Sequence, residues 1–335
     1  MVRNAQNKIF IFREGEKVQI EAYGEHIIRV RASKGEIEDL NWTLLPPKED
    51  RASVSEEGDN IVLENGGIRA IVSSDGKIAF KNQAGEVLFE ELWRNERDID
   101  ARVLRGHVGG SSHIELHLRQ YAGEHFYGLG QEAHDLFDLK GATLDLCQQN
   151  TKSTIPFVMS SRGYGFIWNN PAIGRVEFGT SGTRWVAESA RQMDYLVIAG
   201  DTPGEIEHRY CEVTGYAPEF PEWATGLWQS KLRYETQDEL MEVAREYKRR
   251  GITPSIIVCD YFHWPQQGEW KFDKKYWPEP EKMVKELNEM GIRLLVSIWP
   301  TVDPRSENYI EMRDQNMLIR SERGPGTLMY CRGPE

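Results

Sequence analysis

The sequence predicts a multidomain β then α/β chain: an N-terminal β-sandwich domain over residues 1–220, followed by an incomplete (β/α)8 (TIM) barrel over residues 221–335. Three observations carry this prediction. Short alternating runs broken by turn residues fill the first part, strands and helices alternate in the second, and polar and aromatic residues follow each strand of the second part. A length of 335 residues agrees with two domains, because one domain has about 150 residues.

Short runs of alternating apolar and polar residues recur in the first 220 residues, and turn residues separate them. Asp75-Gly76 lies between two such runs and is typical of a tight type I′ hairpin, and Ala84-Gly85 divides the next pair. No stretch of this part has a convincing helical period, so the pattern favours a β-sandwich. The runs include residues 8–12, 18–22, 27–31, 71–72, 78–80, 114–118, 157–160, 165–168 and 195–198.

Strands and helices alternate after Pro221. Thr236 and Glu239 form a capping box at the start of the first predicted helix, and Gly251 supplies the left-handed residue that ends it. Strand, helix, strand, helix, strand in succession predicts a parallel sheet. The predicted strands span residues 226–230, 256–259 and 294–298, and the predicted helices span about 236–250 and 280–290.

Parallel strands build either an open doubly wound sheet or a closed barrel, and both carry their chemistry at the carboxyl ends of the strands. A nucleotide-binding open sheet needs a glycine-rich turn after its first strand, and residues 230–234 contain no glycine. The barrel is therefore favoured. A full barrel needs about 250 residues, and the part beyond residue 220 provides only about three to four βα units. The sequence therefore looks like the front part of a longer protein.

The chain is acidic, with 41 basic residues, 53 acidic residues and a net charge of −12. Nucleic acids and anionic membranes both attract clusters of Lys and Arg, so we expect no nucleic acid and no membrane among the partners. No apolar run approaches the roughly 18 residues that cross a bilayer.

The four cysteines, Cys147, Cys211, Cys259 and Cys331, are far apart and form no C-x-x-C motif. Disulfide frameworks and zinc sites need closer spacing, so we expect free thiols in a reducing compartment. The first eight residues lack the apolar stretch of a secretory signal. Both observations lead us to expect a cytoplasmic protein.

Six short motifs follow one another along the chain: Phe126-Tyr127-Gly128-Leu129-Gly130-Gln131, Trp168-Asn169-Asn170-Pro171, Trp228-Gln229-Ser230, Val258-Cys259-Asp260-Tyr261-Phe262-His263-Trp264, Trp270-Lys271-Phe272-Asp273 and Ser297-Ile298-Trp299-Pro300. In this order they resemble glycoside hydrolase family 31, the retaining α-glucosidase and α-xylosidase family. That family has an N-terminal β-sandwich before its barrel, and the motifs span nearly the whole chain. The third and fourth motifs are more similar to the α-xylosidase branch than to the maltase branch.

The resemblance implies a double displacement without a cofactor. One Asp attacks the anomeric carbon, and a second carboxylic acid about 5–5.5 Å away protonates the leaving oxygen. In the family these groups lie at the ends of the fourth and sixth barrel strands, and neither position falls within this chain. No catalytic residue is therefore assigned here. The chain alone is expected to be inactive, and the full-length protein is expected to hydrolyse an α-linked oligosaccharide or another α-glycoside.

Asp260 closes the second predicted barrel strand, so its side chain should point into the barrel mouth. The resemblance implies that its carboxylate hydrogen-bonds the hydroxyls of the sugar in the −1 subsite. The alternative is a structural Asp that caps a local turn. By strand-end position alone, Asp260 and Asp303 would be the nucleophile and acid candidates, and we decline that pairing. Asp303 is instead expected to cap a helix beginning near Ser306.

The other candidates are aromatic or cationic. The rings of Trp264, Trp270 and Trp299 could stack on sugar faces, although large aromatics also serve as core or loop anchors. Arg233 and Lys231 follow the first strand, and each either lines the pocket or pairs with a carboxylate. The predicted substrate-binding residues are Asp260, Tyr261, Phe262, Trp264, Trp299 and Arg233.

Two further patterns carry no function. Residues 128–133 match G-x-G-x-x-A, but no amphipathic helix follows them, so a nucleotide site is not expected. His263 has no second His at ligand spacing, so it is interpreted as a loop residue and no metal ligand is assigned.

Two functions stay open at this point. The first is the N-terminal part of an α-glycosidase that acts on α-xylosides or α-glucosides. The second is a short, non-catalytic protein that binds carbohydrate or another partner through its sandwich. An open half-barrel exposes strand edges and apolar helix faces, which favours aggregation or a homo-oligomer and weighs against the second function.

Overall fold

The computed structural model describes residues 1–5, 7–93 and 100–320. The chain divides into two compact units, Met1–Ala217 and Pro218–Glu335. The predicted succession is confirmed: β-sheets dominate the first unit, and strands alternate with helices in the second. Within the described ranges, no helix is long and apolar enough to cross a membrane.

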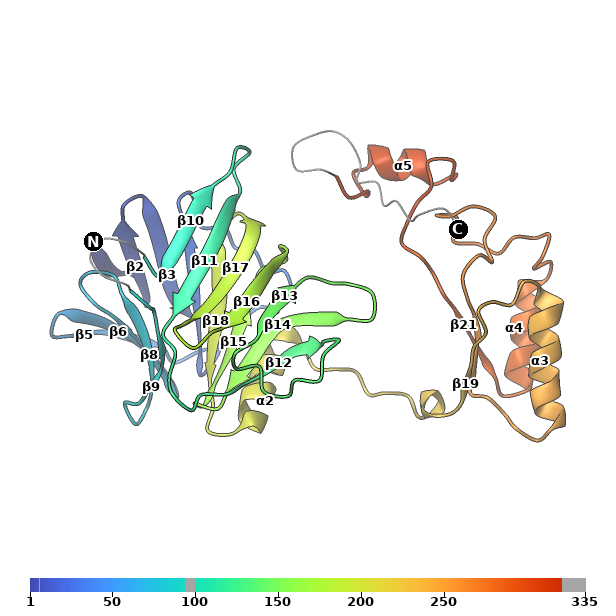
Figure 1. The fold of residues 1–335 in the computed structure, drawn as a ribbon, viewed down its shortest axis with the longest axis horizontal. Helices are drawn as coiled ribbons and strands as arrows, with labels where there is room; N and C mark the ends of the chain where they lie inside the picture. Colours follow the sequence, from blue (N-terminus) through green and yellow to red (C-terminus); the bar gives the residue numbers. More distant parts are fainter. Residues whose placement is uncertain (6, 94–99, 321–335) are drawn as a thin grey trace. The chain divides into compact units, whose positions relative to one another are not determined.

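An eight-stranded antiparallel sheet runs through the first unit, in the order β1-β2-β3-β4-β18-β15-β14-β12 (Figure 1). β18 joins its two halves, because Tyr195 lies opposite Val30 of β4 on one side and opposite Trp168 of β15 on the other. The strands are β1 (Val2–Ala5), β2 (Lys8–Arg13), β3 (Glu16–Ala22), β4 (Ile27–Ser33), β12 (Phe126–Gln131), β14 (Ser153–Ser160), β15 (Tyr164–Trp168) and β18 (Met193–Ala199).

Two five-stranded antiparallel sheets share one apolar core with the central sheet. Phe80 of one small sheet, Trp185 of the other and Phe166 of the central sheet are all fully buried there. This layering is the predicted β-sandwich. The strands of the small sheets are β5 (Ser53–Glu57), β6 (Asn60–Asn65), β7 (Ile68–Val72), β8 (Ile78–Asn82) and β9 (Val87–Glu90) in one, and β10 (Arg102–Gly106), β11 (Ser112–Leu118), β13 (Thr143–Leu146), β16 (Gly174–Phe178) and β17 (Thr183–Ala190) in the other.

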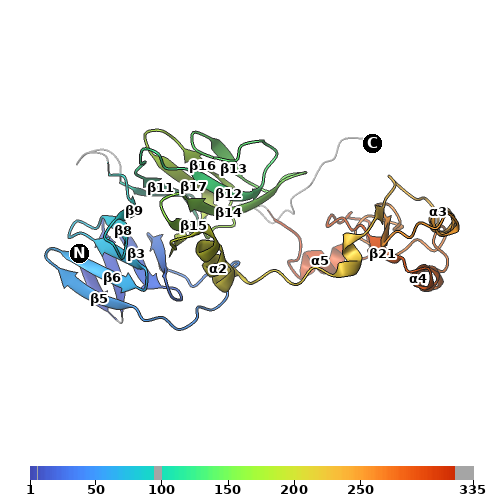
Figure 2. The same cartoon turned by 90° about the horizontal axis from the view of Figure 1, so that it is seen from below.

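A helix that the sequence analysis missed, α2 (Pro203–Thr214), covers the other face of the central sheet (Figure 2). Ile206 of α2 packs with Leu196 and Ile198 of β18, whereas the alternate β18 side chains point into the sandwich core. β18 is therefore buried on both faces, and its sequence reads as a continuous apolar run.

The Asp75-Gly76 hairpin exists, but its predicted tight type I′ turn is wrong. Five residues, 73–77, join β7 to β8. Gly76 alone adopts a positive φ, of 87°, whereas a type I′ turn needs two such residues. The side-chain oxygen of Ser73 accepts a hydrogen bond from the Lys77 amide at 3.1 Å, which stabilises the longer loop.

The second unit contains a three-stranded parallel sheet in the order β19-β20-β21 (Figure 1). This is the pairing expected of consecutive βα units, with Trp228 opposite Ile256 and Ile256 opposite Arg293. The elements are a short 3-10 helix (Glu222–Thr225), β19 (Trp228–Gln229), α3 (Gln237–Arg249), β20 (Ile256–Cys259), α4 (Pro280–Glu289), β21 (Arg293–Val296) and α5 (Tyr309–Asp314).

The predicted ends of α3 are confirmed. The Thr236 side chain accepts a hydrogen bond from the Glu239 amide at 3.2 Å, and the Glu239 carboxylate reaches back to the amide of Glu235 at 2.8 Å. Gly251 ends the helix with a φ of 72°. Leu240 and Leu287, from α3 and α4, are completely buried in a core shared with β20.

The expected helix near Ser306 begins later, at Tyr309, and Asp303 does not cap it. Asp303 instead holds the turn before the helix. Its side chain accepts a hydrogen bond from the Arg305 amide at 2.8 Å, and its carbonyl accepts one from the Ser306 amide at 2.8 Å. The turn occupies the residues that the sequence analysis assigned to the first helical turn.

Candidate active site

Three loops meet where the strands of the parallel sheet end. Because parallel strands all end at the same edge, the segments that follow β19, β20 and β21 lie close together. Residues 230–236 follow β19, 260–279 follow β20, and 297–308 follow β21. All six predicted substrate-binding residues lie in these loops.

Asp260 follows β20 directly and is half-buried. Its Oδ1 accepts a hydrogen bond from the amide of Tyr261 at 2.8 Å, and its carbonyl oxygen lies 3.2 Å from Nδ1 of His263. Within the described residues no hydrogen bond reaches its Oδ2. The carboxylate therefore caps a local turn with one oxygen and leaves the other for a ligand.

The four predicted aromatic residues form one cluster. The rings of Tyr261 and Trp299 stack, with centroids 5.2 Å apart and planes inclined by 23°. Phe262 lies 5.9 Å from both Trp264 and Trp299, edge-on to the first and tilted to the second. The contacts bring residues from the β20 and β21 loops together as a continuous aromatic wall.

Of the two cations after β19, only Arg233 belongs to this site. Its guanidinium carbon lies 5.6 Å from the centre of the Phe262 ring, in a cation–π contact. Lys231 forms an exposed ion pair with Glu239. Of the two alternatives left open in the sequence, Arg233 lines the pocket and Lys231 pairs with a carboxylate.

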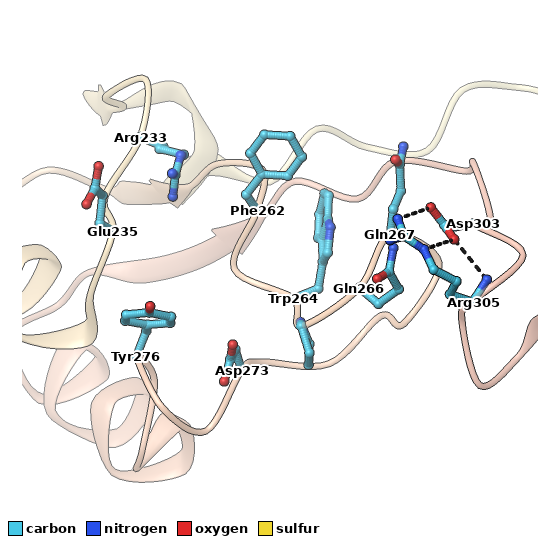
Figure 3. Close-up of a pocket in the computed structure, with 11 residues that line it drawn as sticks. Arg233, Glu235, Phe262, Trp264, Gln266, Gln267, Asp273, Tyr276, Asp303 and Arg305 are labelled. Carbon is cyan, nitrogen blue, oxygen red and sulfur yellow. Dashed lines mark hydrogen bonds and ion pairs between the residues drawn. The ribbon is translucent and has the colours of Figure 1, made fainter. Parts of the chain in front are cut away.

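The loops enclose an open pocket of about 510 Å³, shown in Figure 3. Of the predicted set, Arg233, Phe262 and Trp264 line it directly. The other three, Asp260, Tyr261 and Trp299, do not line it, although Tyr261 and Trp299 both contact the Phe262 ring. The other lining residues, which the sequence analysis did not include in its substrate-binding set, are Glu235, Pro265, Gln266, Gln267, Asp273, Tyr276, Asp303 and Arg305.

Asp303 and Arg305 form a two-pronged ion pair at the pocket, with both nitrogen–oxygen distances 2.9 Å. The Arg305 guanidinium lowers the pKa of Asp303 to about 2. Asp303 is therefore an ionised acceptor throughout the neutral range. Burial lowers the pKa of His263, which is 3% exposed, so its imidazole is neutral there.

The loops after β20 and β21 are tied to each other. The Asp303 amide donates to the carbonyl of Gln267 at 3.0 Å, and the Asn308 side chain donates to the carbonyl of Gly268 at 2.8 Å. The indole N–H of Trp270 donates to the carbonyl of Trp299 at 3.0 Å, so this predicted stacking residue also anchors a loop.

The G-x-G-x-x-A pattern set aside in the sequence has a structural role. Gly128 and Gly130 flank an irregularity in the pairing of β12 with β14, and no helix begins there. In the described part of the chain, no group of three or more His, Cys, Asp or Glu residues is placed to hold a metal ion. Cys147, Cys211 and Cys259 are free thiols, and Cys331 lies outside the described residues.

The described chain is thus a β-sandwich followed by the first units of a (β/α)8 barrel, with a carboxylate and an aromatic wall at the strand ends. The comparisons make this specific. Two family models match the chain. The model of the "Glycosyl hydrolase 31 N-terminal galactose mutarotase-like domain" matches residues 17–177, and the model of the "Glycosyl hydrolases family 31 TIM-barrel domain" matches residues 217–332. The chain belongs to glycoside hydrolase family 31.

Individual relatives agree with this family. An uncharacterized family 31 glucosidase of Pseudescherichia vulneris is 40% identical over 330 residues, and an α-xylosidase of Saccharolobus solfataricus is 33% identical over 313 residues. The alignments cover 93% and 90% of this chain. A solved family 31 α-xylosidase from a soil metagenome, complexed with xylose, is 45% identical over 97% of this chain, with a TM-score of 0.92.

The chain spans about half the length of these relatives. It covers 62% and 42% of the two sequences and 51% of the solved structure.

Proposed function

We propose that this chain is the N-terminal part of a retaining α-glycosidase that hydrolyses α-xylosides, and α-glucosides less well, without a cofactor. The observation that carries the proposal is Asp260, a strand-end carboxylate that directly precedes Tyr261 of the aromatic wall and has one oxygen without a hydrogen bond from any described residue. The similarity to the α-xylosidases of Saccharolobus solfataricus and of a soil metagenome supports xylose over glucose.

In this proposal the chain supplies one wall of the sugar site. The second oxygen of Asp260 accepts hydrogen bonds from sugar hydroxyls, and Phe262 and Trp264 present apolar rings to the pyranose face. The nucleophile and the acid/base lie beyond residue 335, on the later barrel strands. Residues 1–335 alone therefore do not turn over substrate.

The test is hydrolysis of 4-nitrophenyl α-xyloside and α-glucoside by the complete protein and by its Asp260→Asn variant. We expect the variant to lower kcat/KM by at least about a hundredfold, because hydrogen bonds to a charged acceptor strengthen as the oxocarbenium-like transition state forms. Asp59→Asn removes the same charge from an exposed turn of the first unit and serves as the matched control.

Two results would contradict the proposal. Near-wild-type turnover by Asp260→Asn would remove Asp260 from the site. Absence of turnover by the complete protein, together with heat of binding to xylose or α-linked oligosaccharides in calorimetry, would favour the non-catalytic carbohydrate-binding function instead.

The cytoplasmic location and the homo-oligomer also stay predictions. Fractionation of the source cells tests the first, and light scattering on the purified complete protein tests the second. Recovery in a secreted fraction, or a monomeric mass, would contradict them.

A further inference from the structure

A buried histidine lies beside the aromatic wall. Phe262 and Trp264, its neighbours in the chain, line the pocket (Figure 3), whereas His263 does not line it and is 3% exposed. Its ring packs against Trp264 and Phe272, with centroids 4.8 Å and 5.0 Å away. A buried imidazole costs free energy unless it is hydrogen-bonded, and an apolar side chain would fill the same space without that cost. Packing alone therefore does not account for a histidine here.

The hydrogen bond of His263 falls on the peptide unit between Asp260 and Tyr261. Its Nδ1 lies 3.2 Å from the carbonyl oxygen of Asp260. Because a carbonyl oxygen can only accept a hydrogen bond, Nδ1 must carry the proton. The neutral ring described above is therefore the Nδ1–H tautomer.

The same peptide unit also holds the Asp260 carboxylate. The amide N–H of Tyr261 belongs to this planar unit and donates to Oδ1 of Asp260 at 2.8 Å. The unit is thus held at its oxygen by His263, and its N–H in turn holds one carboxylate oxygen. Rotation of the unit would turn the N–H away from Oδ1. The oxygen that no described residue reaches, Oδ2, would then lose its fixed direction.

The backbone at this point needs such support. Phe262 has a φ of 64°, a left-handed conformation that a bulky residue keeps only where its surroundings hold it. The hydrogen bond from His263 to Asp260 spans this residue. The backbone of His263 is itself fixed, because its carbonyl accepts a hydrogen bond from the amide of Asp273 at 2.7 Å.

We propose that His263 is a positioning residue for the hydrolysis: its Nδ1–H fixes the peptide unit between Asp260 and Tyr261, and through it the direction of the Asp260 carboxylate. This inference rests on the proposed function and adds to it a residue that acts on the substrate only through Asp260. A purely structural histidine would stabilise the fold without a separate effect on turnover.

Two variants of the complete protein separate the hydrogen bond from the packing. His263→Asn keeps a donor close to the position of Nδ1 but loses most of the ring, whereas His263→Phe keeps an aromatic ring against Trp264 and Phe272 but has no donor. With 4-nitrophenyl α-xyloside, the Phe variant should lower kcat/KM about ten- to a hundredfold, mainly through kcat, and the Asn variant only about threefold. Tm should follow the opposite order and be lower for the Asn variant, which leaves a cavity.

A double-mutant cycle tests whether His263 acts through Asp260. In the Asp260→Asn background, His263→Phe should lower kcat/KM by less than about twofold, because the charge that it orients is already gone. His208→Phe is the matched control. It makes the same replacement at an exposed position of α2 and should leave kcat/KM unchanged. His263→Leu also lacks a donor and repeats the comparison if the phenylalanine ring does not fit.

The outcomes distinguish this inference from the proposed function. Wild-type turnover by the variants without a donor, or losses of activity that follow the order of Tm, would reduce His263 to a packing role and leave the α-glycosidase in place. An undiminished effect of His263→Phe in the Asp260→Asn background would overturn its action through Asp260. Failure of the wild-type protein to hydrolyse any α-glycoside would overturn the proposed function and this inference with it.

Discussion

Two buried tyrosines in the sandwich core differ by one hydrogen bond. The hydroxyl of Tyr164 donates to Glu124 at 2.8 Å, whereas that of Tyr195 has no partner among the described residues. Tyr164→Phe should lower the free energy of unfolding by about 1–3 kcal/mol, because it leaves a buried carboxylate short of a donor. Tyr195→Phe should leave it unchanged or raise it by up to about 1 kcal/mol.

Urea unfolding of the two variants, followed by tryptophan emission, measures this difference. Each variant serves as the control for the other, since both remove one hydroxyl from a fully buried ring of the same core. Equal losses in the two variants would mean that the Tyr195 hydroxyl is satisfied, for instance by a buried water.

His26 makes the stability of the first unit depend on pH. Its Nδ1 accepts a hydrogen bond from the Gly67 amide at 2.6 Å, which requires an unprotonated Nδ1. Burial, reinforced by the positive charge of Arg209, lowers the pKa of His26 below its usual 6.5. Because His26 binds a proton more readily in the unfolded chain than in the folded one, the folded state is destabilised by protonation. The stabilisation that the neutral ring provides is fully present above pH 6.5 and decreases as the pH falls below 6.5.

In the variant His26→Asn, the free energy of unfolding should decrease less than in the wild type as the pH falls. Asn tolerates the left-handed backbone of this position, where φ is 64°, and does not titrate. The measurement is the free energy of unfolding from pH 7.5 to 5, compared between wild type and variant, in which all other histidines are the same. Parallel pH profiles would contradict the assignment to His26.

At this same scale, the sequence motifs predicted residues that the structure brings together at the strand ends, while their role in substrate binding stays a prediction. The aromatic cluster of Tyr261, Phe262, Trp264 and Trp299 comes from two such motifs. Gln266, Gln267 and Arg305, which also line the pocket, were not predicted because their position depends on hydrogen bonds between two loops, such as that from the Asp303 amide to the Gln267 backbone carbonyl. The sequence of one loop contains no periodic pattern that predicts its contacts with a second loop.

Among the elements, β12 depends on its glycines. Gly130 has a φ of 84°, and a Cβ at this position would overlap the carbonyl oxygen of Ser153 in β14. Gly130→Ala should therefore destabilise the first unit by about 1–3 kcal/mol or more, through both backbone strain and displacement of β14. The G-x-G pattern records a close approach of two strands rather than a phosphate site.

Gly204→Ala is the matched control. Gly204 lies in the first turn of α2, where no atom comes within 4 Å of an added Cβ. Alanine should raise the free energy of unfolding there by about 0.5–1 kcal/mol. Thermal or urea unfolding of both variants tests the pair, and a Gly130→Ala protein as stable as wild type would refute the close-approach argument.

Elements with a strong local signal were predicted, and elements set by longer-range packing were not. The strand pairs of the sandwich and the helices α3 and α4 follow from alternation and capping residues. α2 carries a cap as well, since Thr202 accepts from the Glu205 amide at 3.2 Å. Its apolar face is narrow, with only Ile206 and Val213 buried, so periodicity alone did not reveal it. The capping box formed by Thr202 and Glu205 would have revealed the helix.

On the scale of the whole molecule, the two units differ in how much apolar surface each encloses. The first unit buries side chains from three sheets in one core and covers a second face with α2. The described part of the second unit has a smaller core, and β19 and β21 are both outer strands of its sheet. Leu227, Trp228 and Ile298, around those strands, are 45–57% exposed. We therefore expect the second unit to be the less stable one.

This difference predicts two unfolding transitions for the 335-residue chain, with the second unit unfolding at the lower guanidinium concentration. Leu240 of α3 and Leu116 of β11 are both fully buried, one in each core. Replacing either with Ala should cost about 2–5 kcal/mol, because it removes buried methyl groups and leaves a cavity. Leu240→Ala should move only the first transition, and Leu116→Ala only the second. Tryptophan emission and far-ultraviolet circular dichroism follow both transitions, and one shared transition moved by either substitution would mean that the two cores unfold as a single cooperative unit.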